Sequence, residues 1–248
     1  MRVMLRRVVG RRGLAAARRA RWIVRRRMGY RRRLVPASRN FGYDRGTPID
    51  RYYIESFLAG HAGDVRGRVL EVGDDGYTRR FGRDVGTADV VDIDAANPSA
   101  TLVGDLADPA TLRREAFDCI ICTQTLMLIY DVRAAIANLH RALRPGGVLL
   151  VTVSGISQIC RAEMERHGDF WRFTSRSLQS LLDEFFAGDG VRVQAFGNVR
   201  SSSAFLYGLA QEELTSRELD LNDPDFELII GGRAVKPKLA GATLRSAA

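Results

Sequence analysis

The sequence has almost no lysine, few cysteines and no long apolar run, and each shortage excludes a class of protein. Lys236 and Lys238 are the only lysines, so arginine supplies nearly all of the positive charge. The three cysteines lack the spacing of a disulfide framework, which is usual in a reducing cytoplasm. No stretch of about eighteen apolar residues predicts a transmembrane helix, and no arginine-free apolar segment at the start predicts a secretory signal.

Two of the cysteines, Cys119 and Cys122, have the C-x-x-C spacing of redox and zinc sites. They lie in the apolar run FDCIICTQTL, which predicts a strand. An offset of three residues along a strand directs two side chains to opposite faces. We therefore expect both thiols to pack in the core, and we predict no metal site.

Negative charge is absent from residues 1–33, which contain fourteen arginines. Subtracting this +14 from the net charge of +9 leaves −5 for the rest of the chain. Such an arm fits a solvated tail or a helix drawn to an anionic membrane. Nucleic-acid binding is disfavoured because no stacking platform or recognised motif accompanies the charge. The sequence predicts a cytoplasmic protein, with the arm as a peripheral attachment to the inner membrane face.

The rest of the chain has the length of one α/β domain. Thr47, Pro48 and Asp50 have the pattern of a helix start, with Thr47 as the N-cap of a helix that reaches residue 60. The predicted organisation is an arginine-rich arm over 1–33, a linker over 34–46, a single domain over 47–238 and a tail over 239–248.

Short apolar runs alternate with helical segments along this domain. Uninterrupted apolar strands are buried on both faces, so the pattern predicts a doubly wound, mostly parallel sheet with helices on both faces. The expected strands are 68–73, 88–93, 102–103, 117–122, 148–153, 191–196 and 226–234. The expected helices are 77–81, 109–114, 132–143, 175–186 and 204–214, with a helical insert near 156–167.

Ligands of a doubly wound sheet bind beyond the carboxyl ends of its strands. The first strand ends in LEVGDDGY, where Gly73 allows a ligand to approach the backbone closely. Asp74 and Asp75 would repel the pyrophosphate of a dinucleotide, and the G-x-G-x-x-G pattern is absent. S-adenosylmethionine has no phosphate and carries a sulfonium and an ammonium group, so an acidic turn does not penalise it.

Three further strand ends supply polar side chains. Asp92 ends VVDID about twenty residues after the glycine turn, where an acid accepts hydrogen bonds from ribose hydroxyls. Asp105 follows the next strand, where its carboxylate would accept from an adenine amino group. Gln124 and Thr125 follow the fourth strand, near the centre of the expected site.

Together these segments resemble class I SAM-dependent methyltransferases, most of all the methyltransferase type 11 group of small-molecule enzymes. The resemblance covers residues 64–236 and implies a Rossmann-like sheet of seven strands, with the last strand antiparallel. It rests on RVLEVGDDGYTRRF, VVDID, LVGDL, FDCIICTQTLMLIYDVRAAIANLHRALRPGGVLLVTV and FELIIGGRAVKP.

The resemblance implies S-adenosylmethionine as the cofactor and gives each strand end a role. The implied contacts are Glu71, Gly73 and Asp74 at the methionine and ribose end, Asp92 at the ribose, Asp105 at the adenine, and Gln124 and Thr125 beside the transferring methyl group.

Two positions depart from the family pattern. Asp75 and Tyr77 stand where the turn of the family usually has its second and third glycines, and Leu128 stands where many relatives have histidine. These departures leave a second hypothesis open, in which the chain is a non-catalytic partner or scaffold with the methyltransferase fold. That protein would associate with a membrane through its basic arm.

The stretch CRAEMERHGDFWRFTSRSL follows the fifth strand, where this fold often covers its acceptor site. Its D-F-W-R-F-T resembles a motif of methyltransferases encoded beside polysaccharide glycosyltransferases, which implies O-methylation of a small molecule or a sugar or glycan acceptor. His167 and Asp169 are the candidate catalytic residues, and Trp171 and Arg172 are the candidate acceptor-binding residues. Core packing of Trp171 and a helix-end role of His167 are the alternatives.

Overall fold

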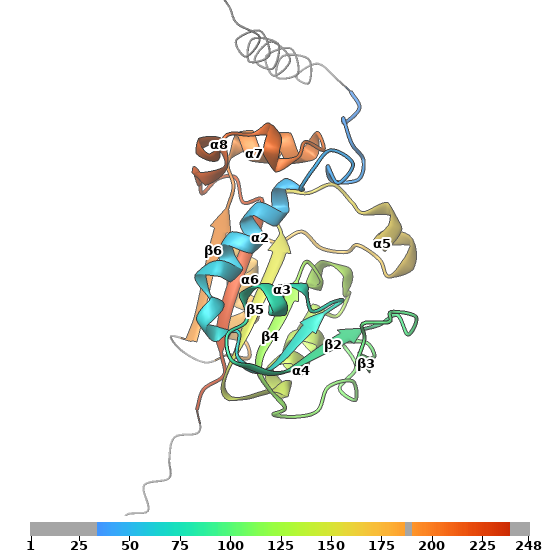
Figure 1. Cartoon of the computed structure of the whole chain (residues 1–248), viewed down its shortest axis with the longest axis vertical. Coiled ribbons are helices and arrows are strands. Elements are labelled where there is room, and N and C mark those ends of the chain that lie inside the picture. The colour runs from blue at the N-terminus through green and yellow to red at the C-terminus, as the bar shows by residue number, and fades with distance from the viewer. Residues whose placement is uncertain (1–33, 187–189, 239–248) are drawn as a thin grey trace, which may run out of the picture.

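A sheet of seven strands forms the centre of the protein in the computed structural model, which describes residues 34–186 and 190–238 (Figure 1). The spatial order is β3-β2-β1-β4-β5-β7-β6. All pairings are parallel except those that β7 makes with β5 and β6. The predicted α/β sheet with an antiparallel last strand is therefore confirmed. The strands are β1 (Gly67–Val72), β2 (Val85–Asp92), β3 (Leu102–Val103), β4 (Phe117–Thr123), β5 (Leu143–Ser154), β6 (Val191–Phe196) and β7 (Ile229–Val235).

Helices cover both faces of the sheet, and one short helix stands apart from it (Figure 1). One face packs against α2 (Ile49–Gly60), α3 (Gly76–Phe81), α7 (Val199–Leu206) and α8 (Ser216–Asp220). The other packs against α4 (Val132–Ala142) and α6 (Ser175–Asp183). The helix that stands apart is α5 (Arg161–Arg166), and the single-turn helices are η3 (Ala62–Asp64), η4 (Leu126–Leu128) and η6 (Gln211–Glu213).

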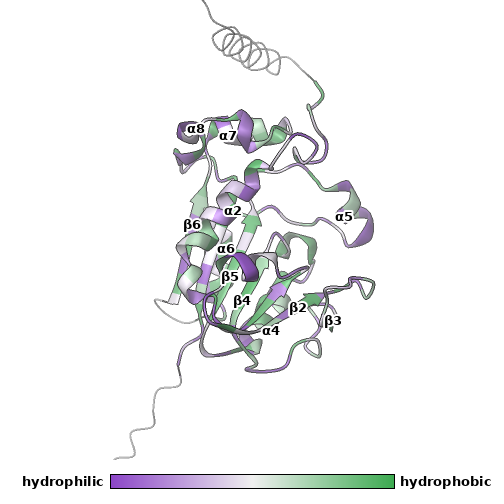
Figure 2. Cartoon of the chain, in the orientation of Figure 1, coloured by the Kyte–Doolittle hydropathy of each residue, from purple (hydrophilic) through white to green (hydrophobic). Residues whose placement is uncertain are grey.

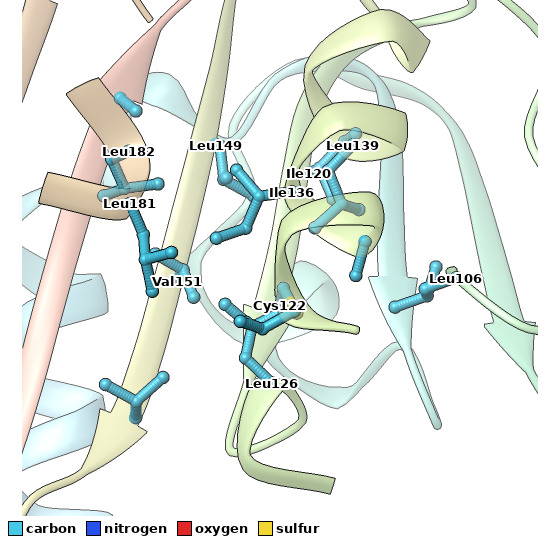
Figure 3. Packing of buried hydrophobic residues seen from close by; sticks show 14 of the residues in the cluster. Leu106, Ile120, Cys122, Leu126, Ile136, Leu139, Leu149, Val151, Leu181 and Leu182 are labelled. Atoms are coloured by element: carbon cyan, nitrogen blue, oxygen red, sulfur yellow. The ribbon is translucent and has the colours of Figure 1, made fainter. Parts of the chain in front are cut away.

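Two hydrophobic clusters, one on each face, hold these layers together. Figure 3 shows the cluster between the sheet and α4 and α6, where Cys122 packs beside Leu126. Cys119 belongs to the opposite cluster, under α2 and α7. Burial raises the pKa of both thiols, so neither forms a ready thiolate. The prediction that these cysteines are core residues is confirmed. Figure 2 shows the same division, with hydrophobic strands inside and a hydrophilic α3 outside.

Two expected helices differ from the structure. The segment 109–114 forms turns in place of the predicted brief helix. The helix predicted over 204–214 begins earlier and ends at Leu206, because Asn198 caps it by accepting from the amides of Arg200 and Ser201. It ends before Gly208, whose φ of 69° turns the chain back against Ser38.

The predicted N-cap at Thr47 is wrong by one residue. Helix α2 begins at Ile49 with Pro48 in the N-cap position, and it has no side-chain cap. The Thr47 hydroxyl instead donates to Glu212 Oε1 over 2.8 Å. This long-range contact competes for the hydroxyl that a local cap would use.

The segment 34–46, which the sequence predicts as a linker, packs against the chain that follows α7. The Ala37 amide donates to the Tyr207 carbonyl over 2.7 Å. Arg45 forms an ion pair with Glu213 at 2.6 Å, and both side chains are largely buried. These contacts make the segment part of the folded body.

Candidate active site

The carboxyl ends of β1, β2 and β4 lie level with one another at one edge of the sheet. Val72 pairs with Val91, so Gly73 and Asp92 are the next residues on adjacent strands. On the other side of β1, Glu71 pairs with Ile121, which brings the end of β4 to the same height. The register therefore gathers the strand ends that the sequence singles out.

A turn after β1, the Gly73–Gly76 turn, opens this edge. Gly73 has a φ of 89°, and no atom lies within 4 Å of the position that a Cβ would occupy. The Asn97 side-chain amide donates to the Gly73 carbonyl and to Asp92 Oδ2, each over 2.6 Å. Asn97 thus ties the turn to the end of β2 and fixes the direction of the Asp92 carboxylate.

Glu71 supports this turn from below. Its carboxylate accepts from the Tyr77 amide over 3.1 Å and from the amide and hydroxyl of Thr78, each over 2.7 Å. Burial raises the pKa of the Glu71 carboxyl, and the bonds from Thr78 oppose that rise. With 2% of its surface exposed, Glu71 holds the start of α3 and presents no free carboxylate to a ligand.

The two aspartates of the turn are held by their own neighbours. Asp74 Oδ1 accepts from the Gly76 amide over 2.7 Å, which closes the turn. Asp75 pairs with Arg79 one turn along α3, at 2.7 Å. Tyr77 packs its ring against Phe81, with centroids 6.1 Å apart. Its side chain belongs to the cluster under α2, and its hydroxyl accepts from Arg51 over 2.8 Å.

Asp105, Gln124 and Thr125 occupy the remaining strand ends. Asp105 is exposed, and its Oδ1 accepts from the Ala107 amide over 2.8 Å. Gln124 has a φ of 52°, which is uncommon for a residue other than glycine. Its side chain bonds Thr152 and Ser154 of β5, and the Thr125 hydroxyl donates to the Thr123 carbonyl over 3.0 Å. Backbone conformations of this kind are enriched at functional sites.

The four residues predicted in the insert divide into an ion pair and two partly exposed side chains. Asp169 accepts from both terminal nitrogens of Arg172, at 2.5 and 2.9 Å, and from the Cys160 amide at 3.0 Å. The Arg172 bonds hold the pKa of Asp169 below its ordinary value, although burial opposes them. This geometry favours a structural role for the pair over proton transfer by Asp169. His167 lies 4.0 Å from Glu163 at the end of α5.

Trp171 belongs to an exposed group of three aromatic rings, here called the aromatic surface. Tyr130, Phe170 and Trp171 have 72%, 47% and 38% of their surfaces exposed. Tyr130 stacks on Trp171 with centroids 6.0 Å apart and meets Phe170 edge-on at 5.4 Å. The Trp171 indole N–H donates to the Ile129 carbonyl over 3.0 Å, which fixes the ring. Core packing does not account for Trp171.

The backbone anchors the aromatic surface to the end of β4. The amides of Phe170 and Trp171 donate to the Met127 carbonyl, over 2.8 and 3.3 Å. Gly168 has a φ of 98°, and a Cβ there would lie 2.2 Å from the Phe170 ring. Glycine is therefore required for the rings to gather beside the strand that carries Gln124.

Three residues of this region escape sequence reasoning. Asn97 lies in a polar loop, and no local pattern shows that its amide reaches Gly73. Arg51 lies on the polar side of α2, where a solvated arginine is the ordinary expectation. Tyr130 directly precedes Asp131, the N-cap of α4, and that position gives only a weak signal that the ring is exposed.

A cavity of about 550 Å³ lies at the opposite, amino-terminal edge of the strands. Two carboxylates of its lining are paired, since Asp64 bonds Arg233 at 2.7 Å and Asp118 bonds Arg144 at 2.8 Å. Across residues 34–186 and 190–238, no group of three or more His, Cys, Asp or Glu is arranged to hold a metal ion. Within the same ranges, no helix is both long and apolar enough to cross a bilayer.

The groups at the carboxyl edge fit S-adenosylmethionine. Open space borders Gly73, and Asp92 offers a carboxylate to hydroxyl donors at the next strand end. The acidic residues of the turn suit a ligand with positive charge and no phosphate.

Comparison with known proteins finds one family that matches part of the chain. The family model described as a methyltransferase domain matches residues 72–151. Among curated proteins, no sequence matches this chain.

Solved structures share the fold at low sequence identity. A SAM-dependent methyltransferase from Archaeoglobus fulgidus is 11% identical, with a TM-score of 0.50 over 75% of this chain and 94% of that one. The N-methyltransferase NodS from Bradyrhizobium japonicum, solved with S-adenosylhomocysteine, is 17% identical, with a TM-score of 0.51 over 85% and 98%. The [4+2]-cyclase SpnF is 17% identical, with a TM-score of 0.52 over 83% and 87%. The chain thus contains a segment, residues 72–151, that matches a methyltransferase domain, and it shares its fold with solved SAM-dependent methyltransferases.

Proposed function

We propose that this methyltransferase transfers the methyl group of S-adenosylmethionine to an oxygen atom of a small-molecule or sugar acceptor. The observation that carries the proposal is the Asn97 amide, which joins the Gly73 carbonyl to the Asp92 carboxylate over two bonds of 2.6 Å. A carboxylate aimed in this way is ready to accept from the vicinal hydroxyls of a ribose.

Each predicted cofactor residue then has a distinct task. Asp92 accepts from the ribose, Asp105 lies toward the adenine, and Gly73 and Asp74 border the methionine end. Glu71 supports the cofactor site without contacting the cofactor, because its carboxylate accepts hydrogen bonds from the amides at the start of α3. When bound, S-adenosylmethionine supplies an electrophilic methyl group.

Methyl transfer is an in-line displacement, so it depends mainly on orientation of the acceptor. Gln124 and Thr125 lie at the end of β4, and the aromatic surface is anchored to the same segment through Met127. Exposed aromatic faces suit the apolar face of a sugar ring. Tyr130 has the largest exposed fraction of the three rings, so we assign it, with Trp171, to acceptor stacking.

An oxygen nucleophile benefits from a base that removes its proton. Of the two candidates in the insert, Asp169 is engaged by Arg172 on both oxygens, and the lowered pKa makes it a weak base. His167 is the candidate that keeps an accessible side chain. We propose His167 as the proton acceptor, with Arg172 and Asp169 holding the loop that carries it.

Isothermal titration calorimetry with S-adenosylmethionine tests the cofactor site. We expect the full chain to bind and the Asp92→Ala variant to lose affinity by about 100-fold, because two hydrogen bonds to a charged group are lost. Asp94→Ala is the matched control, since Asp94 is exposed and accepts from the Ala96 amide in its own loop. If the folded full chain does not bind S-adenosylmethionine, the proposed activity is contradicted and the scaffold hypothesis is favoured. Full retention by Asp92→Ala would mean that the ribose site lies elsewhere.

Release of S-adenosylhomocysteine in the presence of sugars, glycans and amines tests the acceptor class. We expect release with a hydroxyl-bearing sugar. We expect the Tyr130→Ala variant to have a raised KM for the acceptor, with its kcat and its affinity for S-adenosylmethionine unchanged. Release with amines alone contradicts O-methylation.

The basic arm, residues 1–33, lies outside the described residues. We propose that its fourteen arginines attach the protein to an anionic membrane surface, which would bring the methyltransferase to acceptors held there.

A further inference from the structure

Tyr77 is the second residue of α3, directly behind the Gly73–Gly76 turn. Its amide is bonded by Glu71, so the backbone of this residue is fixed relative to β1. The side chain is large and half-buried, and Tyr77 follows by only four positions Gly73, whose Cβ position borders open space. Where the Tyr77 ring lies therefore affects the room beside the turn.

Arg51 of α2 binds the hydroxyl of the Tyr77 ring. Its Nη1 donates to the Tyr77 hydroxyl over 2.8 Å, and its Nε donates to the Tyr43 hydroxyl over 3.1 Å. The guanidinium is thereby oriented from two directions. Tyr43 belongs to the segment 34–46 and Tyr77 to α3, so Arg51 connects both to α2.

The Tyr77 ring is held by packing on Phe81 and in the cluster under α2, and by the hydrogen bond from Arg51. Packing is not directional, whereas a hydrogen bond from a charged donor is strong and fixes the position of the hydroxyl. Without Arg51, the ring loses this directional restraint and can populate other rotamers.

We propose that Arg51 is a positioning residue that keeps the Tyr77 ring against α2 and so keeps the space beside the Gly73–Gly76 turn open for the cofactor. This inference rests on the proposed cofactor site. It assigns Arg51 a role through Tyr77, without direct contact between Arg51 and the cofactor.

A double-mutant cycle in the full chain tests this inference by calorimetry with S-adenosylmethionine. We expect Arg51→Met to weaken binding at least about tenfold and Tyr77→Phe, which lacks only the hydroxyl, to weaken it in the same direction. Tyr77→Gly removes the obstructing ring, so we expect Arg51→Met combined with Tyr77→Gly to bind within about threefold of the wild-type affinity. A merely structural role of Arg51 would not be rescued in this way.

Arg80→Met is the matched control. Arg80 also bridges α3 to α2, through Glu55 at 2.6 Å, but its side chain is more than half exposed and lies at the other end of α3. We expect this variant to bind like the wild type, and thermal unfolding checks that every variant is folded. If Arg51→Met does not fold, Tyr77→Phe alone decides the matter.

The outcomes separate the two proposals. Absence of binding by the wild type overturns the proposed cofactor site itself. Wild-type binding together with unchanged affinity in folded Arg51→Met or in Tyr77→Phe overturns the role of Arg51. A double variant as weak as Arg51→Met also overturns it, because Arg51 would then act on the cofactor directly.

Discussion

Glu71 and Asp92 are both acidic residues at strand ends, yet their surroundings give them different tasks. Glu71 is buried under the turn, and three donors of Tyr77 and Thr78 occupy its oxygens. Asp92 is bonded by one side-chain amide and by the Asp94 amide, and it lies at the open edge of the sheet. Unused lone pairs on Asp92 can therefore accept from a ligand, whereas those of Glu71 stabilise the start of a helix.

At this scale, Asn97 gives the sharpest prediction. We expect Asn97→Ala to weaken binding of S-adenosylmethionine about tenfold, because the Asp92 carboxylate and the Gly73 carbonyl both lose a donor. Calorimetry measures the affinity, with Ser99→Ala as the control, since only the backbone amide of Ser99 bonds this loop. An Asn97→Ala variant that binds as the wild type does would show that Asp92 needs no such restraint.

At the scale of elements, the sequence pattern predicts those strands and helices whose position depends on neighbouring residues alone. The apolar run ending at Asp92 placed that residue at the end of β2, because a buried parallel strand needs continuous apolar residues. The start of α7 was missed because the Asn198 cap outweighs the apolar pattern that suggested residue 204. Contacts between distant segments, such as Asn97 with Gly73 or Arg51 with Tyr77, leave no periodic signal. Much of the fold, and less of the site, could therefore be predicted.

The insert that contains α5 depends on one ion pair, which makes its stability depend on pH. The bonds from Arg172 lower the pKa of Asp169 in the folded state, so their contribution is present above the unfolded pKa of about 3.9. It is lost as the pH falls through the lower folded value. We expect Asp169→Asn to lower the Tm at pH 7, and the difference from the wild type to shrink as the pH falls below about 3.9.

The control for this prediction is Glu184→Gln. Glu184 pairs with Arg133 at 2.9 Å, but both side chains are well exposed, so its loss should change the Tm little. Thermal unfolding followed by circular dichroism at several pH values measures both variants. A difference between Asp169→Asn and the wild type that persists undiminished at pH 3 would contradict the assigned role of the pair.

At the scale of the whole molecule, two segments far apart in the sequence meet beside the carboxyl edge of the sheet. The sheet presents its carboxyl edge between the insert and the segment 34–46, and Gln158 of the insert bonds the Arg39 carbonyl over 2.9 Å. The two segments that flank the edge are thus joined to each other. Because the arm precedes residue 34 directly, whatever holds the arm acts close to one of these flanking segments.

Membrane attachment through the arm is tested by deleting residues 2–33. With the arm, we expect the chain to pellet with phosphatidylserine-containing vesicles, because its arginines meet anionic headgroups, and to be released as salt shortens the range of that attraction. Removing the arm removes a charge of +14 and leaves the rest of the chain with a net charge of −5, so we expect the shortened chain not to pellet. Vesicles of phosphatidylcholine alone are the control for the lipid, and affinity for S-adenosylmethionine is the control for the domain and should not change. Equal pelleting of both chains would move the membrane contact to the domain, where the exposed rings of the aromatic surface are the next surface to mutate.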